Sequence, residues 1–400
     1  MTTFIIILIC VLLLIAYVFE ITSSKTRIPS VIFLLLVGWI LQQGTHFFEL
    51  KIPELTAFLP ILGTVGLILI VMEGSLELEL DKNKLPIVGK ATIIAFFPML
   101  IFSFGLAFAI HYFGNVSFKI AFANSIPLAI ISSAIAIPSA QNLGAENKEF
   151  VTYESSLSDI FGVLLFNFVV LNETINLHSI GEFFIELILI LVITVIATLG
   201  LTYLLSKIKH HVKFLPIILM VILIYSIAKI YHLPALIFIL LFGLFLGNLK
   251  QMNSNWFIQK LQPEILEHEV LKFKELTVEF AFLIRALFFI LFGFLINSSE
   301  LLNIHSISWS VGIVLGIYLL RFIFLKLIKL EVKPLIFIAP RGLITILLFL
   351  SIPATQIVPL VNNSLIIQVI ILSALIMMFG LMTNKKKVFS AKENSEEINS

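Results

Sequence analysis

The sequence predicts an all-α polytopic membrane protein, from its composition, the spacing of its apolar runs and the distribution of its basic residues. Of its 400 residues, 60% are hydrophobic and 12% are charged. Soluble globular domains have about a quarter of their residues charged. Most of this chain is therefore expected to lie in a bilayer.

Thirteen apolar runs are each long enough to cross a bilayer, which takes about 20 residues. They begin near Phe4, Ile28, Leu55, Ile87, Phe118, Val151, Phe183, Phe214, Leu233, Thr277, Ile307, Leu335 and Leu365. The first run has no basic residue before it and no small-residue cleavage site, so we expect a spanning helix and not a signal peptide. Residues 1–384 are predicted to form one transmembrane domain, and residues 385–400 a short cytoplasmic tail.

Basic residues are concentrated in alternate connectors between the predicted spans. Of the 26 Lys and Arg residues, 21 fall in odd-numbered connectors or the C-terminal tail, Arg321 among them, and three fall in even-numbered connectors. Loops rich in Lys and Arg remain in the cytoplasm. The N-terminus is therefore predicted outside and the C-terminus inside, in a multi-pass protein of the plasma membrane.

Several kinds of chemistry find no support in the sequence. Cys10 is the single cysteine, so neither a disulfide framework nor a thiolate metal site is possible. The net charge is only +2 and its basic residues are dispersed, which argues against nucleic-acid binding. The eight histidines lie at span ends or in connectors, and no nucleophile motif occurs in the spans. We expect no cofactor, no bound metal and no enzymatic activity.

The sixth span carries two acids within an apolar run. Glu154, Ser155, Ser158 and Asp159 all fall in the stretch YESSLSDIFGVLLFN. Ser155 and Asp159 are four residues apart and share a helix face. Because charged groups cost free energy in hydrocarbon, those inside spans normally face a partner, a cavity or an ion pathway. Asp159, near the middle of its span, is the first candidate for such a role.

Two spans contain residues that break helices at membrane depth. The fifth span holds Pro127 and Pro138, and the twelfth holds Pro340 and Gly342 on either side of Arg341. The fifth and twelfth spans are seven apart in chain order. If spans 1 to 6 and 8 to 13 formed two inverted halves, these two spans would occupy equivalent positions. Paired interrupted helices that cross near the midplane form the ion sites of many secondary transporters. We therefore predict inverted repeats with such a crossing.

Taken together, these features resemble the monovalent cation/proton antiporters of the sodium/proton exchanger type. The resemblance covers nearly the whole chain and is carried by ESSLSD at 154–159, RALFFILFGFLI at 285–296 and APRGLITI at 339–346. It implies that Asp159 binds the cation and the proton in turn. It also implies a structural ion pair between Glu154 and Arg341, a position for Glu73 beside the ion, and a homodimer.

Further site residues follow from their place in the polar spans. Hydroxyls of Ser155, Ser158, Ser132 and Ser133 are candidate cation ligands, and Arg285 in the tenth span is a possible accessory residue. Ser158 stands where the family has Asn, and Ser132-Ser133-Ala134 stands where its fifth span commonly reads Thr-Asp-Pro. Loss of that second acid leaves the ion preference open.

Structural roles compete with these assignments. Asp159 could be a structural acid bonded to a neighbouring helix, and Glu154 and Arg341 could each extend to the membrane surface. Glu73 could simply begin the acidic connector that follows it, and Arg285 could cap a helix end. Among functions, we expect electroneutral exchange of a monovalent cation for protons, with Na⁺ first among Na⁺, Li⁺ and K⁺. K⁺/H⁺ exchange is the alternative, and a cation channel is a more remote one.

Overall fold

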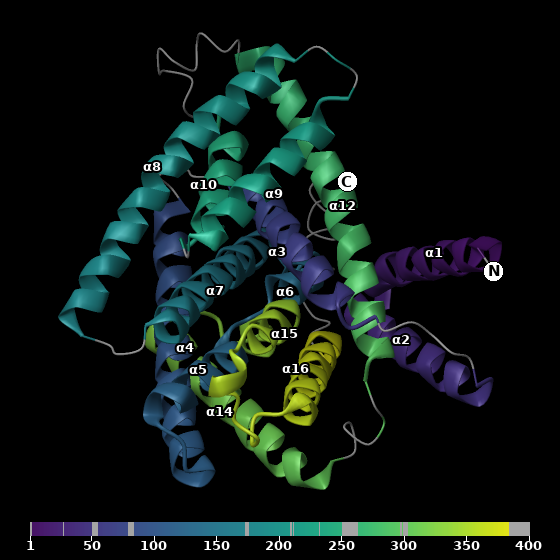
Figure 1. Ribbon diagram of the computed structural model, residues 1–400, viewed down its shortest axis with the longest axis vertical. Helices are drawn as coiled ribbons and strands as arrows, with labels where there is room; N and C mark the ends of the chain where they lie inside the picture. The colour runs from purple at the N-terminus through teal and green to yellow at the C-terminus, as the bar shows by residue number, and fades with distance from the viewer. Residues whose placement is uncertain are drawn as a thin grey trace, which may run out of the picture.

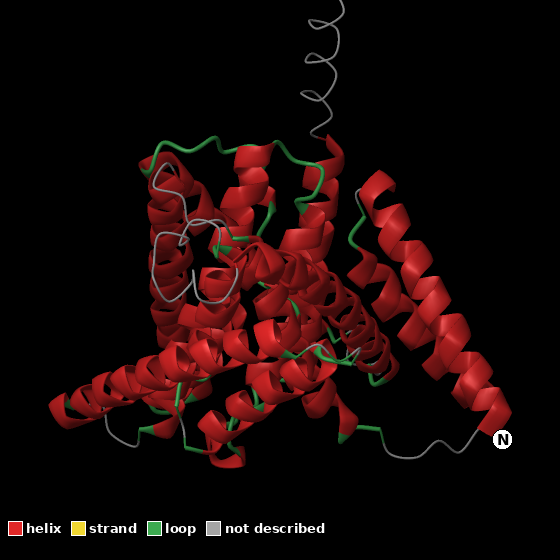
Figure 2. Ribbon diagram, turned by 90° about the horizontal axis from the view of Figure 1, so that it is seen from above, coloured by secondary structure: helices red, strands yellow, loops and turns green. Residues whose placement is uncertain are grey.

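The computed structural model describes residues 2–26, 28–49, 55–78, 84–172, 176–208, 210, 212–231, 233–249, 263–296, 298 and 303–383. Within these ranges the regular structure is entirely helical, with no strand (Figure 1, Figure 2). The predicted tail, residues 385–400, lies outside the described residues.

In chain order, the longer helices are α1 (Thr2–Thr26), α2 (Ser30–Phe47), α3 (Phe58–Glu77), α4 (Leu85–Gly114), α5 (Phe118–Ala129), α6 (Ser133–Ser139), α7 (Ala145–Leu171), α8 (Leu177–Lys207), α9 (Phe214–Ile230), α10 (Leu236–Gly247), α12 (Pro263–Phe294), α14 (Ile304–Leu327), α15 (Leu343–Leu350) and α16 (Asn363–Thr383). Two 3₁₀ turns, η2 (Leu335–Phe337) and η3 (Ala354–Gln356), flank α15.

The thirteen predicted spans correspond to helical segments of this list. Ten segments in the described part are long and apolar enough to cross a membrane, with α5 and α6 forming one of them. The shorter apolar helices α9 and α10 and the interrupted segment from η2 to α15 account for the rest. The prediction of an all-α polytopic fold with interrupted helices is confirmed.

Helix α12 begins at Pro263, well before the predicted start at Thr277. The charged segment in between continues the same helix, because its apolar residues recur at helical spacing. Leu266, Val270, Phe273 and Thr277 are all buried and lie on one face. A hydropathy window locates the apolar part of such a helix but not its amphipathic beginning.

The helices form two bundles. In one, called here the scaffold bundle, α2 and α3 pack against α12 and α10, with α1 and α9 at the edge. In the other, called the crossing bundle, α4 packs on α5, α7 and α14, and α14 packs on α16 and η2, with α6 and α15 inside. Helix α8 follows α7 in the chain and packs on α10 and α12 of the scaffold bundle (Figure 1).

Helix contacts recur between the two halves of the chain. Helix α4 packs on α7 as α14 packs on α16, and α2 packs on α12 as α10 packs on α3. The corresponding helices are seven spans apart in the chain: α4 corresponds to α14, α7 to α16, α2 to α10 and α3 to α12. This recurrence is what two structurally equivalent halves produce, and it places the two interrupted segments in corresponding positions.

Glycines allow the closest helix crossings inside the scaffold bundle. A Cβ atom on Gly38 of α2 would lie 2.7 Å from the backbone nitrogen of Phe294 in α12. A Cβ on Gly247 of α10 would lie 2.7 Å from the carbonyl oxygen of Leu76 in α3. Backbone therefore meets backbone at both crossings, and no other residue fits there without displacing a helix.

Glycines of α3 also face the crossing bundle, but they contact side chains there. A Cβ on Gly74 would lie 3.1 Å from Oγ of Ser156 in α7 and 3.4 Å from the side chain of Ile137 in α6. Gly63 faces the side chain of Leu347 in α15. This surface between the bundles is lined by small and apolar groups.

Candidate ion-binding site

The fifth span is interrupted between its two prolines and not at either of them. Helix α5 ends at Ala129 and α6 begins at Ser133, leaving an extended segment of three residues. Its backbone groups find partners outside the helix. The amide of Ile131 donates to Oγ of Ser158 at 3.0 Å, and the amide of Ser132 donates to the carbonyl oxygen of Pro340 at 2.9 Å.

The interrupted segment of the twelfth span contacts that of the fifth span through the hydrogen bond between Ser132 and Pro340. Residues 338–342 are extended between η2 and α15, and Pro340 accepts the amide of Ser132. A Cβ on Gly342 would lie 3.0 Å from Oγ of Ser132 and closer still to the side chain of Ile135. The two broken spans therefore cross in contact, as the breaker positions predict.

Arg341 satisfies the carbonyl groups that the break leaves free. Its Nε and Nη2 donate to the carbonyl oxygens of Leu128 and Ala129, each at 2.9 Å, and its Nη1 donates to that of Ala339 at 2.6 Å. Leu128 and Ala129 are the last residues of α5, where carbonyls lack helical partners and a cation is favoured. The buried guanidinium thus holds the crossing together.

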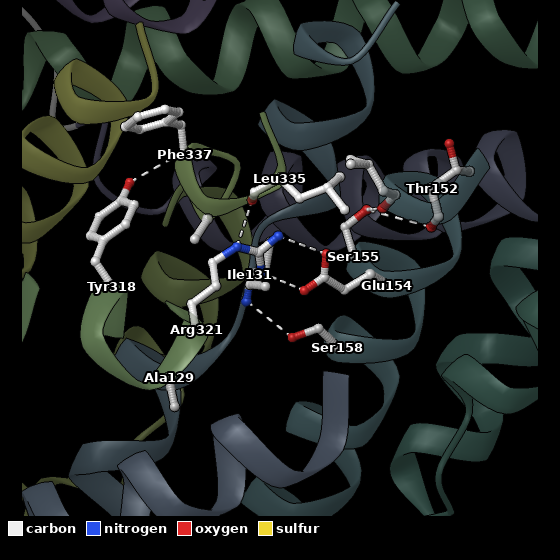
Figure 3. Close-up of polar contacts among 12 residues, drawn as sticks. Ala129, Ile131, Thr152, Glu154, Ser155, Ser158, Tyr318, Arg321, Leu335 and Phe337 are labelled. Carbon is white, nitrogen blue, oxygen red and sulfur yellow. Dashed lines mark hydrogen bonds and ion pairs between the residues drawn. The ribbon is translucent and has the colours of Figure 1, made fainter. Parts of the chain in front are cut away.

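Glu154 is paired with Arg321, so the expected pair of Glu154 with Arg341 is corrected. Nη2 of Arg321 donates to Oε2 of Glu154 at 2.9 Å, and Nη1 donates to Oε1 (Figure 3). Its Nε donates to the carbonyl oxygen of Leu335 at 2.7 Å. The side chains of Glu154 and Arg321 are 1% and 4% exposed, respectively. A planar guanidinium can form two parallel hydrogen bonds with a carboxylate. The guanidinium of Arg341 instead donates to three backbone carbonyl groups.

Arg321 was missed because counting by hydropathy placed it in a cytoplasmic connector. It lies inside α14, with apolar turns on both sides. A signal was available in the sequence, since the apolar run that begins near Ile307 continues through Phe322 and Phe324. An arginine inside such a run needs a partner in the same way as an acid does.

Asp159, in the middle of α7, lies beside the first residue of α6 and is almost completely buried. Ser133, the first residue of α6, donates its hydroxyl to Oδ2 of Asp159. Oδ1 has no hydrogen-bond partner among the described residues, and the residue is 1% exposed. In the described part of the chain Asp159 contacts no basic side chain. A carboxylate so placed can accept a proton or a small cation.

The other serines lie near Asp159 but use their hydroxyls differently. Ser158 accepts the amide of Ile131 and so touches the extended segment (Figure 3). Ser155 donates to the carbonyl oxygen of Val151 in its own helix, at 2.8 Å. Ser132 is buried at the crossing, where its amide is bonded to Pro340. Of the four predicted serines, Ser133 is thus the one that contacts the carboxylate of Asp159. The hydroxyls of the others and backbone groups lie nearby.

Glu73 and Arg285 belong to the scaffold bundle, where they form a cluster with Glu20. Nη2 of Arg285 lies 3.3 Å from Oε1 of Glu20, and Nη1 lies 4.0 Å from Oε2 of Glu73. Arg285 lies in the interior of α12, which excludes a role as a helix cap. Glu73 lies within α3 beside Gly74, which faces α7. Glu20 was not singled out from the sequence.

The comparison with known families agrees with this geometry. Residues 9–384 match the family described as sodium/hydrogen exchanger, transmembrane. The chain belongs to this family. It is therefore a membrane antiporter of the sodium/proton exchange type and not an enzyme. No curated protein sequence matches it.

Solved structures of a sodium proton antiporter have the same fold. The sodium proton antiporter MjNhaP1 from Methanocaldococcus jannaschii, solved at pH 8, superposes with a TM-score of 0.67 at 18% identity. The match covers 96% of this chain and 99% of that chain. An electron-microscopy structure of MjNhaP1 gives the same TM-score and identity, covering 96% of this chain and 95% of that one. At this identity the likeness concerns the fold.

Among the described residues, no group of three or more His, Cys, Asp or Glu side chains could hold a resident metal ion. The monovalent cations of a sodium/proton exchanger are transported substrates, which are distinct from a resident metal. Oxygen atoms of Asp159, of the serines and of the freed backbone provide the hard ligands that such cations prefer.

Proposed function

We propose that this exchanger moves a monovalent cation, Na⁺ first among the candidates, against protons, and that Asp159 binds the two in turn. The observation that carries the proposal is the buried carboxylate of Asp159 at the crossing of the interrupted spans. Its Oδ2 accepts from Ser133 and its Oδ1 has no partner among the described residues. A cation can occupy this carboxylate only after the proton has left, so competition couples the two flows.

The proposed ligand set comes from both bundles. Asp159 and Ser133 supply oxygens at the crossing, with Ser158, Ser155 and Ser132 nearby. Glu73 would approach from α3, whose Gly74 packs against Ser156, one helical turn from Asp159. A site shared between two bundles changes when one bundle moves relative to the other.

The other buried charges of the crossing bundle have fixed partners, which supports electroneutral exchange. Glu154 and Arg321 neutralise each other, and Arg341 is held by three carbonyl groups. Asp159 then carries the exchangeable charge of the crossing bundle by itself. One proton for one cation follows from one shared carboxylate.

Transport would proceed by alternating access, with the crossing bundle moving against the scaffold bundle. From the distribution of basic residues we place the N-terminus outside, the C-terminus in the cytoplasm and the protein in the plasma membrane. The resemblance to the exchanger family suggests a homodimer.

K⁺/H⁺ exchange is the second candidate, for one specific reason. Two polar positions of the family site are hydroxyls here, Ser158 in place of Asn and Ser133 in place of an acid. A site with one carboxylate and several neutral oxygens selects less strongly for a small cation, because its negative charge is lower.

Dequenching of a pH dye in proteoliposomes tests the function and the selectivity together. Purified protein should dissipate a proton gradient when Na⁺ is added, and Li⁺, K⁺ and Rb⁺ give the selectivity order.

Asp159→Asn should abolish the response while the protein remains folded, since an amide can neither titrate nor neutralise a cation. As a matched control, Glu149→Gln removes a half-buried carboxylate that lies 2.7 Å from Lys84, outside the crossing of the interrupted spans, and should keep exchange. Full activity of Asp159→Asn would refute the assignment, and unitary currents would indicate a channel.

A further inference from the structure

The cluster of Glu20, Glu73 and Arg285 contains two acids and one base. Arg285 is the most buried of the three, with its side chain 8% exposed, against 18% for Glu73 and 28% for Glu20. Its nearest contact is Glu20 at 3.3 Å, and Glu73 lies at 4.0 Å. The guanidinium is therefore shared unequally, and with both carboxyl groups ionised the cluster has one net negative charge.

Glu20 is held in place from a second side. Oγ of Ser30, at the start of α2, donates to Oε2 of Glu20 at 2.6 Å, while Oε1 faces Arg285. Both oxygens of the Glu20 carboxylate are thus engaged, by α2 and by α12. Among the described residues nothing comparable holds Glu73, whose ion-pair contact is the one to Arg285 at 4.0 Å.

Glu73 is the member of the cluster next to the crossing bundle. The residue after it, Gly74, contacts Ser156 of α7 and Ile137 of α6. The other charged side chains near it form a separate pair, Lys274 and Glu77, 3.6 Å apart. The carboxylate with the weaker partner in the cluster is therefore the one whose chain neighbour packs on the crossing bundle.

We propose that Glu20 is a positioning residue for transport: by binding Arg285, it keeps Glu73 from being neutralised and so available to attract the cation. This inference rests on the proposed function, in which Glu73 contributes to cation binding. Without Glu20, Arg285 would turn fully to Glu73, and the incoming cation would have to compete with a buried guanidinium. Opposite charges about 4 Å apart in a protein interact by several kcal/mol.

The test measures initial rates of Na⁺-driven exchange in proteoliposomes of the full chain. Glu20→Gln should raise the KM for Na⁺ by about tenfold or more, with the maximal rate at saturating Na⁺ changed much less. Ser30→Ala, which removes the second support of Glu20, should raise KM in the same direction by a smaller factor. Glu149→Gln serves as the matched Glu-to-Gln control and should leave KM unchanged.

Rescue separates this role from a structural one. The double variant Glu20→Gln with Arg285→Gln again leaves one net negative charge, on Glu73, and its KM should return toward that of the wild type. If the contact served only to join α1 to α12, the double variant would be at least as impaired as the single one, and the proposal would be overturned. An unchanged KM in Glu20→Gln would overturn it as well. Absence of Na⁺/H⁺ exchange in the wild type would instead refute the proposed function itself.

Discussion

At the scale of single residues, each buried charge in the crossing bundle has a different type of partner. Arg321 is paired with a carboxylate, Arg341 is bound by carbonyl groups, and Asp159 accepts a hydrogen bond from the hydroxyl of Ser133. The first two arrangements neutralise or satisfy the charge permanently. Only the last leaves a group that can change its ligand during a transport cycle.

The Glu154–Arg321 pair should contribute to stability in a way that a double-mutant cycle detects. Glu154→Ala and Arg321→Ala each leave one buried charge unpaired, which costs about 3 to 5 kcal/mol. The double variant should lose less than the sum of the single losses. The thermal midpoint of unfolding in detergent measures the loss in each single variant and in the double variant. Strict additivity would mean that the two side chains do not interact.

Ser133 should tune cation affinity through its bond to Asp159. A hydrogen bond to a charged group contributes about 1.5 to 3 kcal/mol, so Ser133→Ala should raise the KM for the cation by about tenfold or more. Ser155→Ala is the matched control, because that hydroxyl donates within its own helix. A larger effect at Ser155 than at Ser133 would contradict the assignment of the ligands. Both KM values come from the proteoliposome assay.

The sequence predicted the candidate residues better than their partners. A carboxylate inside an apolar run identifies Asp159, and the serines beside it follow from helical spacing. The partner of Glu154 could not be chosen in the same way, because three arginines lie inside or near apolar runs. Which of them meets Glu154 depends on how α14 and the segment after η2 pack. The cluster of Glu20 with Arg285 depends likewise on the packing of α1 against α12.

At the scale of helices, proline and glycine positions predicted which spans are interrupted but not where. The break in the fifth span falls at residues 130–132, between Pro127 and Pro138, where the backbone finds partners on α7 and the twelfth span. Tertiary hydrogen bonds thus determine the break point. The existence of the spans was predictable because it depends on local hydropathy, whereas helix starts such as that of α12 at Pro263 were not.

The crossing of α2 and α12 should tolerate no side chain at its closest point. Gly38→Ala would place a methyl group against the backbone of α12, and overpacking of this kind costs about 1 to 3 kcal/mol. Gly44 lies in the same helix with no atom within 4 Å of its Cβ position, so Gly44→Ala should be neutral or slightly stabilising. The thermal midpoints of the two variants in detergent measure the difference. Equal midpoints would show that the crossing is looser than described.

At the scale of the whole molecule, the polar contacts between helices described above stay within one bundle or the other. Glu154–Arg321, Ser133–Asp159 and the bonds of Arg341 join parts of the crossing bundle. The cluster around Arg285 joins parts of the scaffold bundle. The surface between the bundles is formed by small and apolar groups such as those around Gly74 and Gly63. This division supports movement of one bundle as a unit.

A covalent link across that surface should stop transport. In a Cys10→Ser background, Gly74→Cys with Ser156→Cys should form a disulfide on oxidation, because the Cβ position of one lies 3.1 Å from Oγ of the other. Exchange should fall on oxidation and return on reduction. Ser306→Cys with Asn362→Cys, whose present side chains are 3.5 Å apart inside the crossing bundle, is the control and should retain exchange. Undiminished exchange by the oxidised first pair would argue against relative movement at this surface.

The pH and voltage dependence should follow from a single shared carboxylate. Because protons and Na⁺ compete for Asp159, the KM for Na⁺ should rise as the pH falls, approaching about tenfold per pH unit once the proton dominates. Exchange should not respond to an imposed membrane potential, whereas each net charge moved would change the driving force by about 2.3 kcal/mol per 100 mV. Liposomes clamped with valinomycin and K⁺, with Na⁺ as substrate, measure both. A rate that increases with potential would exclude one-for-one exchange.

The distance along the chain between Glu154 and Arg321 has a consequence for biogenesis. Their separation is 167 residues, and Arg341 is separated by 213 residues from Leu128, whose carbonyl it binds. Synthesis proceeds from the N-terminus, so α7 enters the membrane with its glutamate unpaired, and α8, α9, α10 and α12 follow before α14 brings the arginine. An unpaired charge and free carbonyls are costly in lipid. Final assembly of the crossing bundle must therefore wait until the last spans have been inserted.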